Sequence, residues 1–358
     1  MKAYLILEDG TVFAGTSIGS TKEVISEIVF NTSMDSYLDV LTDASNAGKT
    51  VVMTYPLIGN CGIISDEKPV EVWVDGIIVK EISRRASNFQ CKGDLIDLLV
   101  EQEITGICGL DTRALVIHLR EHGSMKGMIT VNDTFDLDEV MLRLKEYKVE
   151  NSVVKYTSNK KVTILGDKHK VAVLDLGSKK DIVSALTKRG CEIVVLSALS
   201  TAEEILSENP DGIVISTGPD HPKECSAIVD EIRKLMKTDL PMIGIGLGHL
   251  LAAIANGGEV YKLKNGHRGG NYPVKDLSNG HVYISAQNHG YEVDANSLDK
   301  NLAKETFVNV NDGTNEGLTY IGKNIFTVQF SPETCAGQND LGYLYDKFVN
   351  MMEEHSNA

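Results

Sequence analysis

The feature that most restricts the fold of this chain is a short apolar strand that passes through a glycine-rich turn directly into an apolar helix. Residues 240–256 read Leu-Pro-Met-Ile-Gly-Ile-Gly-Leu-Gly-His-Leu-Leu-Ala-Ala-Ile-Ala-Asn. This strand–turn–helix arrangement is typical of a nucleophile elbow, which holds a reactive side chain above a sheet edge and at a helix N-terminus. The tip of this turn is Gly246, which has no side chain that could react. The pattern therefore predicts an enzyme scaffold that lacks its nucleophile.

The elbow belongs to a longer region in which short apolar segments alternate with helical ones. We expect strands at 171–176, 192–197, 212–216 and 241–245, and helices at 179–189, 201–208, 222–237 and from Leu247. Such alternation indicates a mostly parallel sheet covered by helices on both faces. Ligands of these sheets bind beyond the carboxyl ends of the strands. Residues 216–219 and 246–248 are both expected at that edge.

The C-terminal part of the chain is expected to be more antiparallel. Strands are expected at 282–286, after the Asn279-Gly280 turn, and at 325–330. An amphipathic helix is expected near 341–354.

The first 150 residues predict a separate domain of mixed α/β structure. Asp9-Gly10 lies between two apolar segments and indicates a β-hairpin. Further strands are expected at 50–54 and 70–79, and helices at 111–121 and 137–147. Residues 151–170 are polar and are predicted to be a linker, so the second domain would cover 171–358. The predicted fold class is α/β, with two domains.

Composition excludes some functions and partners. The 358 residues carry a net charge of −15, which disfavours binding to nucleic acid phosphates. We find no apolar run of the roughly 18–20 residues that would cross a membrane. The N-terminus becomes acidic too early for a signal peptide, so a cytoplasmic protein is expected. The six cysteines have no CxxC spacing, which favours reduced thiols over a disulfide framework or a zinc site.

Several longer motifs occur in a fixed order along the whole chain. They are Leu-Glu-Asp-Gly-Thr-Val-Phe-Ala-Gly at 7–15, Asn-Thr-Ser-Met at 31–34, Thr-Tyr-Pro-Leu-Ile-Gly-Asn at 54–60, Gly-Leu-Asp-Thr-Arg-Ala-Leu-Val at 109–116, Tyr-Lys-Leu-Lys-Asn-Gly-His-Arg-Gly at 261–269, Gln-Asn-His-Gly-Tyr at 287–291 and Asn-Asp-Gly-Thr-Asn-Glu-Gly-Leu at 311–318. With these motifs the chain resembles the small subunit of carbamoyl-phosphate synthetase. That subunit joins an N-terminal domain of its own to a class I glutamine amidotransferase domain.

The resemblance implies a chemistry and a partner. In the family a Cys attacks the glutamine amide, a His moves the proton, and a Glu orients the His, as for other activated nucleophiles. Ammonia then passes to a large subunit, which binds ATP and magnesium and makes carbamoyl phosphate for arginine or pyrimidine synthesis. The resemblance implies the large subunit as partner, glutamine or ammonia as small molecules, and no cofactor in this chain.

The chain departs from the family pattern at the residues that carry this chemistry. Gly246 stands at the nucleophile position, Ser331 at the base position, and only the orienting acid Glu333 is retained. Leu250 replaces a Gln that contacts glutamine in the family, and Asp220 replaces a Gly of the oxyanion loop. Both nucleophile and base are needed for the covalent route, so the sequence predicts that glutamine is not hydrolysed.

The rest of the glutamine site is present in part. By matching to the family motifs, the site comprises Ser45, Gly218, Asp220, Leu247, Leu250, Asn288, Gly290 and Tyr291. Inherited architecture is favoured over residual glutamine binding, because a site that lacks its polar partner discriminates poorly. No metal site is expected. His249, His267 and His289 are interpreted as structural, and a metal set of His221, Asp220 and Glu333 is not favoured.

Three functions stay open from the sequence. The leading hypothesis is a small subunit that supports synthesis from free ammonia. The second is a non-catalytic sensor or interaction protein with an altered pocket around Asp220, His221 and Leu250. The third is a glutaminase that uses substitute residues, such as Ser331 or Cys335.

Overall fold

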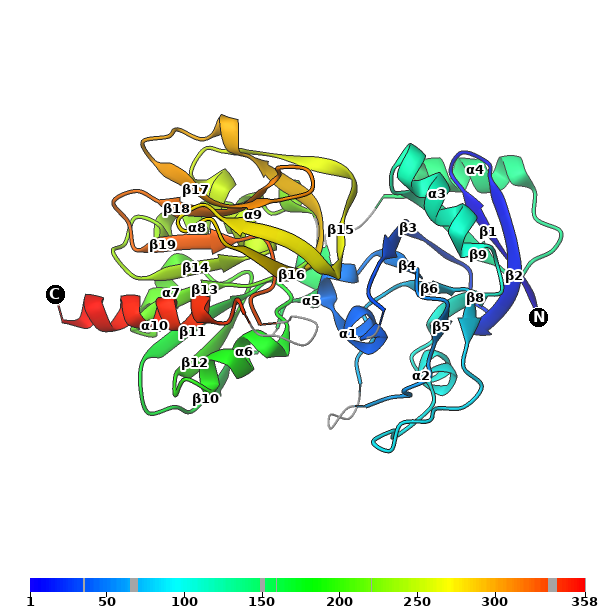
Figure 1. Cartoon of the computed structure of the whole chain (residues 1–358), viewed down its shortest axis with the longest axis horizontal. Helices are drawn as coiled ribbons and strands as arrows, with labels where there is room; N and C mark the ends of the chain where they lie inside the picture. The colour runs from blue at the N-terminus through cyan, green and yellow to red at the C-terminus, as the bar shows by residue number, and fades with distance from the viewer. Residues whose placement is uncertain are drawn as a thin grey trace. The chain divides into compact units, whose positions relative to one another are not determined.

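The computed structural model describes residues 1–34, 36–64, 70–148, 152–158, 160–219, 221–333 and 340–357. The chain forms two compact units, Met1–Glu150 and Asn151–Ala358, each with its own sheet and its own buried apolar clusters (Figure 1). Two of the predicted site residues, Asp220 and Cys335, lie outside the described residues.

The first unit is built on a closed β-barrel. Its strands follow the order β1 (Lys2–Leu7), β2 (Val12–Gly19), β8 (Thr105–Cys108), β6 (Gly76–Val79), β4 (Lys49–Met53), β3 (Val24–Asn31) and β9 (Met125–Thr130). The predicted hairpin is present, since β1 and β2 pair antiparallel around a turn in which Gly10 has a φ of 86°. The strand expected at 70–79 is shorter, because only Gly76–Val79 pairs with its parallel neighbours β4 and β8.

Helices cover this barrel. They are α1 (Tyr37–Thr42), α2 (Leu95–Glu101), α3 (Thr112–His122) and α4 (Leu137–Glu146), with the 3₁₀ turn η1 (Ala44–Asn46) and a two-stranded ribbon of β5 (Leu57–Ile58) and β7 (Glu81–Ile82). The parallel strands β4 and β6 are buried at every residue, which explains their continuous apolar sequences. The apolar sides of α1 and α2 pack on one buried cluster, and that of α3 packs on another.

The second unit contains a ten-stranded sheet. Its order is β10 (Val162–Ile164), β12 (Glu192–Ser197), β11 (Lys170–Asp175), β13 (Gly212–Ile215), β14 (Met242–Ile245), β19 (Ile325–Val328), β18 (Asn315–Tyr320), β17 (Ala303–Asn309), β15 (Glu259–Asp276) and β16 (Val282–Asp294). The five strands from β12 to β19 are parallel. The alternating pattern predicts this for the first four, whereas β19 comes from the segment expected to be more antiparallel and pairs parallel with β14 on one side and antiparallel with β18 on the other. The strands from β18 to β16 are antiparallel and form a twisted extension (Figure 1).

Helices cover both faces of the parallel part. The helices are α6 (Lys180–Thr187), α7 (Ala202–Ser207), α8 (Ser226–Leu235), α9 (Leu247–Ala255) and α10 (Tyr343–Ser356), with the 3₁₀ turns η2 (Pro222–Glu224) and η3 (Ala295–Ser297). Along β11, Ala172 and Leu174 pack in the cluster of α7, α8 and α9, whereas Val171 and Val173 pack in the cluster of α6 and α10. This alternation with period two places one apolar core on each side of the sheet.

The segment predicted as a linker carries secondary structure. Helix α5 (Ser152–Tyr156) places the fully buried Val153 in the core of the second unit. Strand β10 pairs antiparallel with β12 and forms an edge of the sheet. The polar composition of 151–170 conceals these elements, because an edge strand and a one-turn helix each bury only a few side chains.

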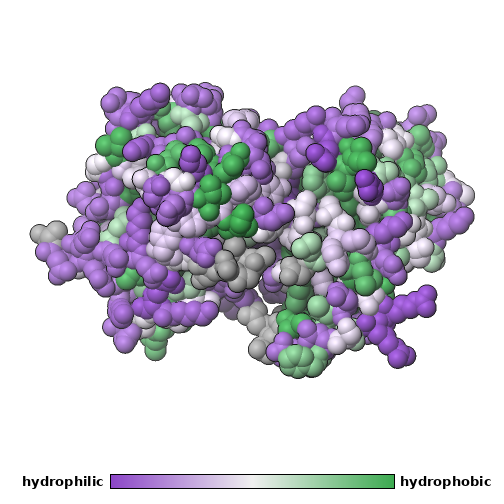
Figure 2. Space-filling view, viewed as in Figure 1, coloured by the Kyte–Doolittle hydropathy of each residue, from purple (hydrophilic) through white to green (hydrophobic). Residues whose placement is uncertain are grey.

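The surface shown in Figure 2 is mainly hydrophilic, with hydrophobic side chains in small separate patches. Among the described residues, no helix is both long enough and apolar enough to cross a membrane.

Candidate active site

The elbow predicted from the sequence is present between β14 and α9. Gly246 precedes the first residue of α9 and has φ 57° and ψ −111°, a conformation that non-glycine residues adopt only under strain. Its amide donates to the carbonyl oxygen of Val328 in β19 at 2.9 Å. The amide of Gly248, in the first turn of α9, donates to the carbonyl oxygen of Ser216 at 3.1 Å. The turn is therefore tied to both neighbouring strands.

Close backbone packing fixes the elbow independently of any catalytic side chain. A Cβ atom on Gly248 would lie 2.2 Å from the carbonyl oxygen of Ile215, at the end of β13. A Cβ atom on Gly218, in the loop after β13, would lie 2.2 Å from the carbonyl oxygen of Leu176. Real Cβ atoms do not approach oxygen so closely, so both positions require glycine.

The space above Gly246 is bordered by Thr217. A Cβ atom on Gly246 would meet the methyl group of Thr217 at 3.2 Å, a tight contact but not a severe clash. Thr217 is buried, and its hydroxyl has no hydrogen-bond partner among the described residues. The tip thus retains room for a small side chain, but the group beside it is a methyl rather than a polar atom.

Ser331, at the base position, is held by a backbone bond and by a lysine. Its amide donates to the carbonyl oxygen of Ala286 at 3.0 Å. The ammonium group of Lys179 donates to the Ser331 hydroxyl at 3.3 Å. Because a protonated lysine cannot accept a proton, this contact does not activate the hydroxyl as a nucleophile.

Glu333, predicted to be the orienting acid, is bonded to a tyrosine, and no imidazole contacts it within the described residues. The hydroxyl of Tyr345 donates to its Oε2 atom at 2.9 Å. Its Oε1 atom is buried and has no hydrogen-bond partner within the described part of the chain. Burial raises the pKa of Glu333, and the nearby Lys179 ammonium opposes that shift. Among the described residues, the only side chain that bonds this carboxylate is therefore the Tyr345 phenol.

The other predicted site residues are divided between the core and the sheet. Leu247 and Leu250 are almost completely buried in the apolar cluster of α7, α8 and α9, on which Tyr291 also packs. Asn288 and Gly290 lie beside Tyr291 on β16. The structure thus brings Leu247 next to Gly218, whose added Cβ would lie 3.0 Å from the Leu247 Cδ2 atom.

Ser45 belongs to the first unit. It lies in η1, is buried, and its amide donates to the Asp43 carboxylate at 2.9 Å. Its carbonyl oxygen accepts a hydrogen bond from the ammonium group of Lys49.

The described cysteines of the second unit are not activated. Cys191 and Cys225 are both buried in apolar clusters. Burial raises the pKa of the Cys225 thiol to about 12 and also raises that of Cys191. Neutral buried thiols are poor nucleophiles, so neither replaces the missing group at the elbow.

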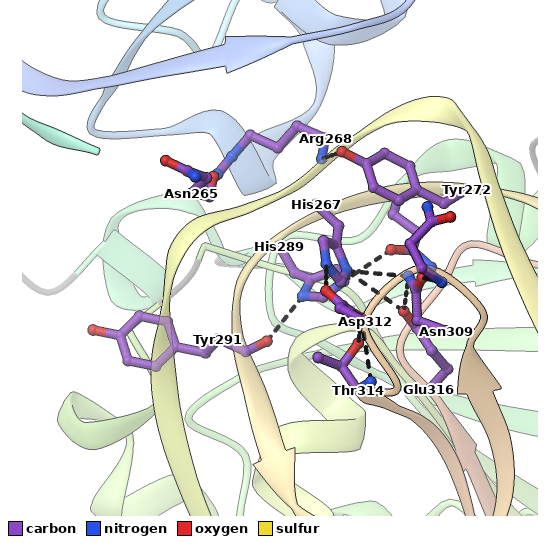
Figure 3. Close-up of polar contacts among 12 residues, drawn as sticks. Asn265, His267, Arg268, Tyr272, His289, Tyr291, Asn309, Asp312, Thr314 and Glu316 are labelled. Atoms are coloured by element: carbon purple, nitrogen blue, oxygen red, sulfur yellow. Dashed lines mark hydrogen bonds and ion pairs between the residues drawn. The ribbon is translucent and has the colours of Figure 1, made fainter. Parts of the chain in front are cut away.

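A second polar site lies on the antiparallel part of the sheet, where sequence analysis expected only structural histidines. His267 of β15 pairs across the strands with His289 of β16, and Glu316 of β18 lies beside them (Figure 3). We call these three residues the histidine–glutamate cluster. The signal was in the sequence, since all three lie in the long motifs, but only the strand register brings those motifs together.

The histidines of this region differ in protonation. Burial holds the pKa of His249 at about 3 and keeps His289 well below its ordinary value. Burial also lowers the pKa of His267, but the carboxylates of Glu316 and Asp312 outweigh it and raise the pKa overall. His249 contacts the Thr327 hydroxyl at 2.8 Å and fits its predicted structural role.

Comparisons with known proteins give a consistent family. The family model "Carbamoyl-phosphate synthase small chain, CPSase domain" matches residues 5–129, and "Glutamine amidotransferase class-I" matches residues 172–351. The carbamoyl phosphate synthase small chain of Clostridium perfringens is 45% identical over 98% of this chain and 99% of its own length. The carbamoyl phosphate synthase small chain of Symbiobacterium thermophilum is 41% identical over 97% of this chain and 98% of its own length. A solved glutamine amidotransferase from Thermotoga maritima covers 54% of this chain and 87% of its own, with 18% identity and a TM-score of 0.39.

Proposed function

This chain belongs to the family of carbamoyl-phosphate synthase small chains, and we propose that it serves its large subunit without hydrolysing glutamine. In this proposal the complex uses free ammonia to make carbamoyl phosphate. ATP and magnesium would be bound by the large subunit, and this chain would need no cofactor of its own. The proposal also places the protein in the cytoplasm, in arginine or pyrimidine precursor synthesis.

The observation that carries the proposal is a complete elbow without a reactive group. Gly246 has the strained backbone of a nucleophile position and lies at the N-terminus of α9. It has no side chain, and Ser331 at the base position is bonded to an ammonium group. A thiol and a base within hydrogen-bond reach are both required for the covalent route. In subtilisin, loss of the nucleophile alone lowers the catalytic rate by on the order of 10⁶.

Retention of the rest of the chain supports a role as a subunit. The relatives align over nearly their whole lengths, including the N-terminal domain, which carries none of the three catalytic positions. A chain kept only for glutamine hydrolysis would have no reason to keep that domain once its nucleophile was gone. We infer that binding to the large subunit is the function under selection.

Reconstitution with the cognate large subunit tests this proposal. Carbamoyl phosphate formation is measured with glutamine or with ammonium as nitrogen source, and the large subunit alone is the control. We expect product from ammonium only, and a higher yield or a longer-lived activity than with the large subunit alone.

Two results would overturn the proposal in different ways. Product from glutamine would show that other residues replace the missing Cys and His, with Ser331 and Cys335 as the first to substitute. Failure of the two chains to copurify, with no change in ammonium-dependent activity, would favour the sensor or interaction protein, which a thermal-shift screen with amino acids and nucleotides then examines.

A further inference from the structure

The histidine–glutamate cluster has the composition and spacing of a metal-binding site. His267, His289 and Glu316 each offer one ligand atom, and these three atoms lie within 4.8 Å of one another. All three residues are buried, with Glu316 fully inaccessible. They come from three different strands, so the fold and not local sequence brings them together.

Hydrogen bonds on the outer side of each imidazole favour one position for its proton. His289 Nδ1 is 2.9 Å from the carbonyl oxygen of Tyr291, which can only accept, so the proton is on Nδ1. His267 Nε2 is 2.8 Å from the Asp312 carboxylate, which places a proton there as well. In the neutral imidazoles the lone pairs are then on His289 Nε2 and His267 Nδ1. A carboxylate or carbonyl behind each histidine is the usual support of a metal ligand.

Two carboxylates in this part of the sheet, Glu316 in the cluster and Glu292 on β16, are buried. Glu316 Oε2 and Glu292 Oε2 are both buried and have no hydrogen-bond partner within the described ranges. Burial and the charges of Asp312 and Glu316 raise the pKa of Glu292 to about 7. A buried carboxylate oxygen needs a hydrogen-bond donor or a cation, and an ion bound at the cluster would satisfy that of Glu316.

We propose that the histidine–glutamate cluster binds one divalent transition-metal ion of the zinc class through His267 Nδ1, His289 Nε2 and the Glu316 carboxylate. Ligands about 2.0–2.1 Å from a tetrahedral zinc lie about 3.3 Å from one another. His267 Nδ1 and Glu316 Oε1 are already 3.5 Å apart. Two imidazoles with one carboxylate suit zinc and similar ions better than magnesium or calcium, which prefer oxygen ligands alone.

Two neighbouring groups would adjust on binding. The Gln287 side-chain oxygen lies 3.2 Å from His289 Nε2, so this amide turns away or supplies a further ligand oxygen. The Asn309 amide, which donates to Glu316 Oε1 at 3.0 Å, keeps that carboxylate in place. The side chain of Asp312, which supports His267, is 43% exposed, so the cluster lies close to the protein surface.

The ion would fix the strand that carries the remnant of the glutamine site. His289 lies between Asn288 and Gly290 on β16, and successive side chains of a strand point to opposite faces. An ion on His289 therefore anchors β16 to β15 and β18 from the face opposite to that of its neighbours. Metal binding at the cluster does not require an active elbow.

Metal analysis of the full-length chain tests the proposal. The protein is purified without a histidine tag, stripped with a chelator, and titrated with Zn²⁺ in competition with a chromophoric chelator. We expect one ion per chain. Co²⁺ in place of Zn²⁺ is expected to give visible absorption bands of a four- or five-coordinate ion, and Mg²⁺ is not expected to compete.

Graded variants separate ligands from supporting residues. H289Q and E316Q are each expected to weaken Zn²⁺ binding by more than about 100-fold, and D312N by about 10–100-fold, the usual effect of losing a supporting carboxylate. H281Q removes an exposed histidine at the start of the same β15–β16 hairpin and is expected to leave the affinity unchanged. Circular dichroism verifies that each variant is folded.

The competing possibility is that His267 is an imidazolium cation that itself neutralises Asp312 and Glu316. In that case the unsubstituted chain binds no zinc at one ion per chain, and the proposal is wrong whether or not the variants fold. Equal losses of binding in H281Q and H289Q would likewise overturn it, because they would show adventitious binding to surface histidines.

Discussion

The elbow and the histidine–glutamate cluster belong to the same sheet, but the elbow is defined by its backbone and the cluster by its side chains. The elbow keeps its backbone, through close packing at Gly218 and Gly248, although its reactive side chains are absent. The cluster keeps its side chains, and hydrogen bonds to Asp312 and Asn309 hold His267 and Glu316 in place. Backbone packing survives loss of chemistry because it also stabilises the core, whereas removing one member of a buried charge cluster leaves the others unpaired.

Restoring a Cys and a His at the elbow is expected to have the largest effect on activity. The unsubstituted chain is expected to hydrolyse glutamine more slowly than a relative with Cys and His, by on the order of 10⁶. The double variant G246C/S331H is expected to raise ammonia release by at least about 100-fold, the low end of what a positioned general base contributes. Ammonia release from glutamine is measured by a coupled dehydrogenase assay.

The matched control for this experiment is G246A/S331H, which imposes the same backbone strain and contact with Thr217 but adds no thiol. Equal ammonia release from the two variants would show that the gain does not come from a covalent route. Full activity in the double variant would mean that Leu250 and the loop at 216–222 are unimportant for binding glutamine.

The next effect concerns the backbone of the elbow. Alanine is the better helix former by about 1 kcal/mol, so propensity alone predicts that G248A stabilises α9. Packing predicts the opposite, because the new Cβ would lie 2.2 Å from the carbonyl oxygen of Ile215. We expect G248A to lower the free energy of unfolding by about 3 kcal/mol in urea denaturation.

The control for that measurement is G257A. Gly257 has a φ of 88° but nothing within 4 Å of an added Cβ atom. The free energy of unfolding of G257A is expected to be lower by about 1 kcal/mol, from backbone strain alone. A stabilised G248A variant would contradict the view that packing preserves the elbow.

A smaller effect is expected from the charge around the cluster. The pKa of Glu292 rises from its ordinary 4.5 to about 7 in the folded chain, through burial and the neighbouring Asp312, Glu316 and Asp294. Between these two values the unfolded chain has lost the proton that the folded chain keeps, so stability falls as pH rises from 4.5 to 7. E292Q is therefore expected to stabilise the metal-free protein at pH 8 by about 1–3 kcal/mol.

The measurement is the free energy of unfolding of both proteins at pH 4.5 and pH 8 after treatment with a chelator. At pH 4.5 the difference is expected to shrink toward zero, since Glu292 is then protonated in the folded chain. A constant difference at both pH values would show that Glu292 acts through packing rather than through its charge.

The parallel half of the second unit was largely predictable from sequence. Its strands and helices alternate in order, and each strand is a short apolar run of the kind that burial on both faces produces. Gly246 directly follows β14, and Ser331 and Glu333 lie in the segment after β19; their assignment to catalytic positions stays a prediction. Elements with few buried side chains were missed, as β10 and α5 were in the segment predicted as a linker.

The sequence was enough to identify the family, the α/β architecture and the glycine at the tip of the elbow, because these depend on local patterns and on which residue stands at a motif position. Tertiary structure alone decided that His267, His289 and Glu316 meet, that Lys179 bonds Ser331, and that Gly248 has no room for a Cβ atom. These are contacts between residues far apart in the chain. Strand register and backbone packing set their distances, and neither is written in any one segment.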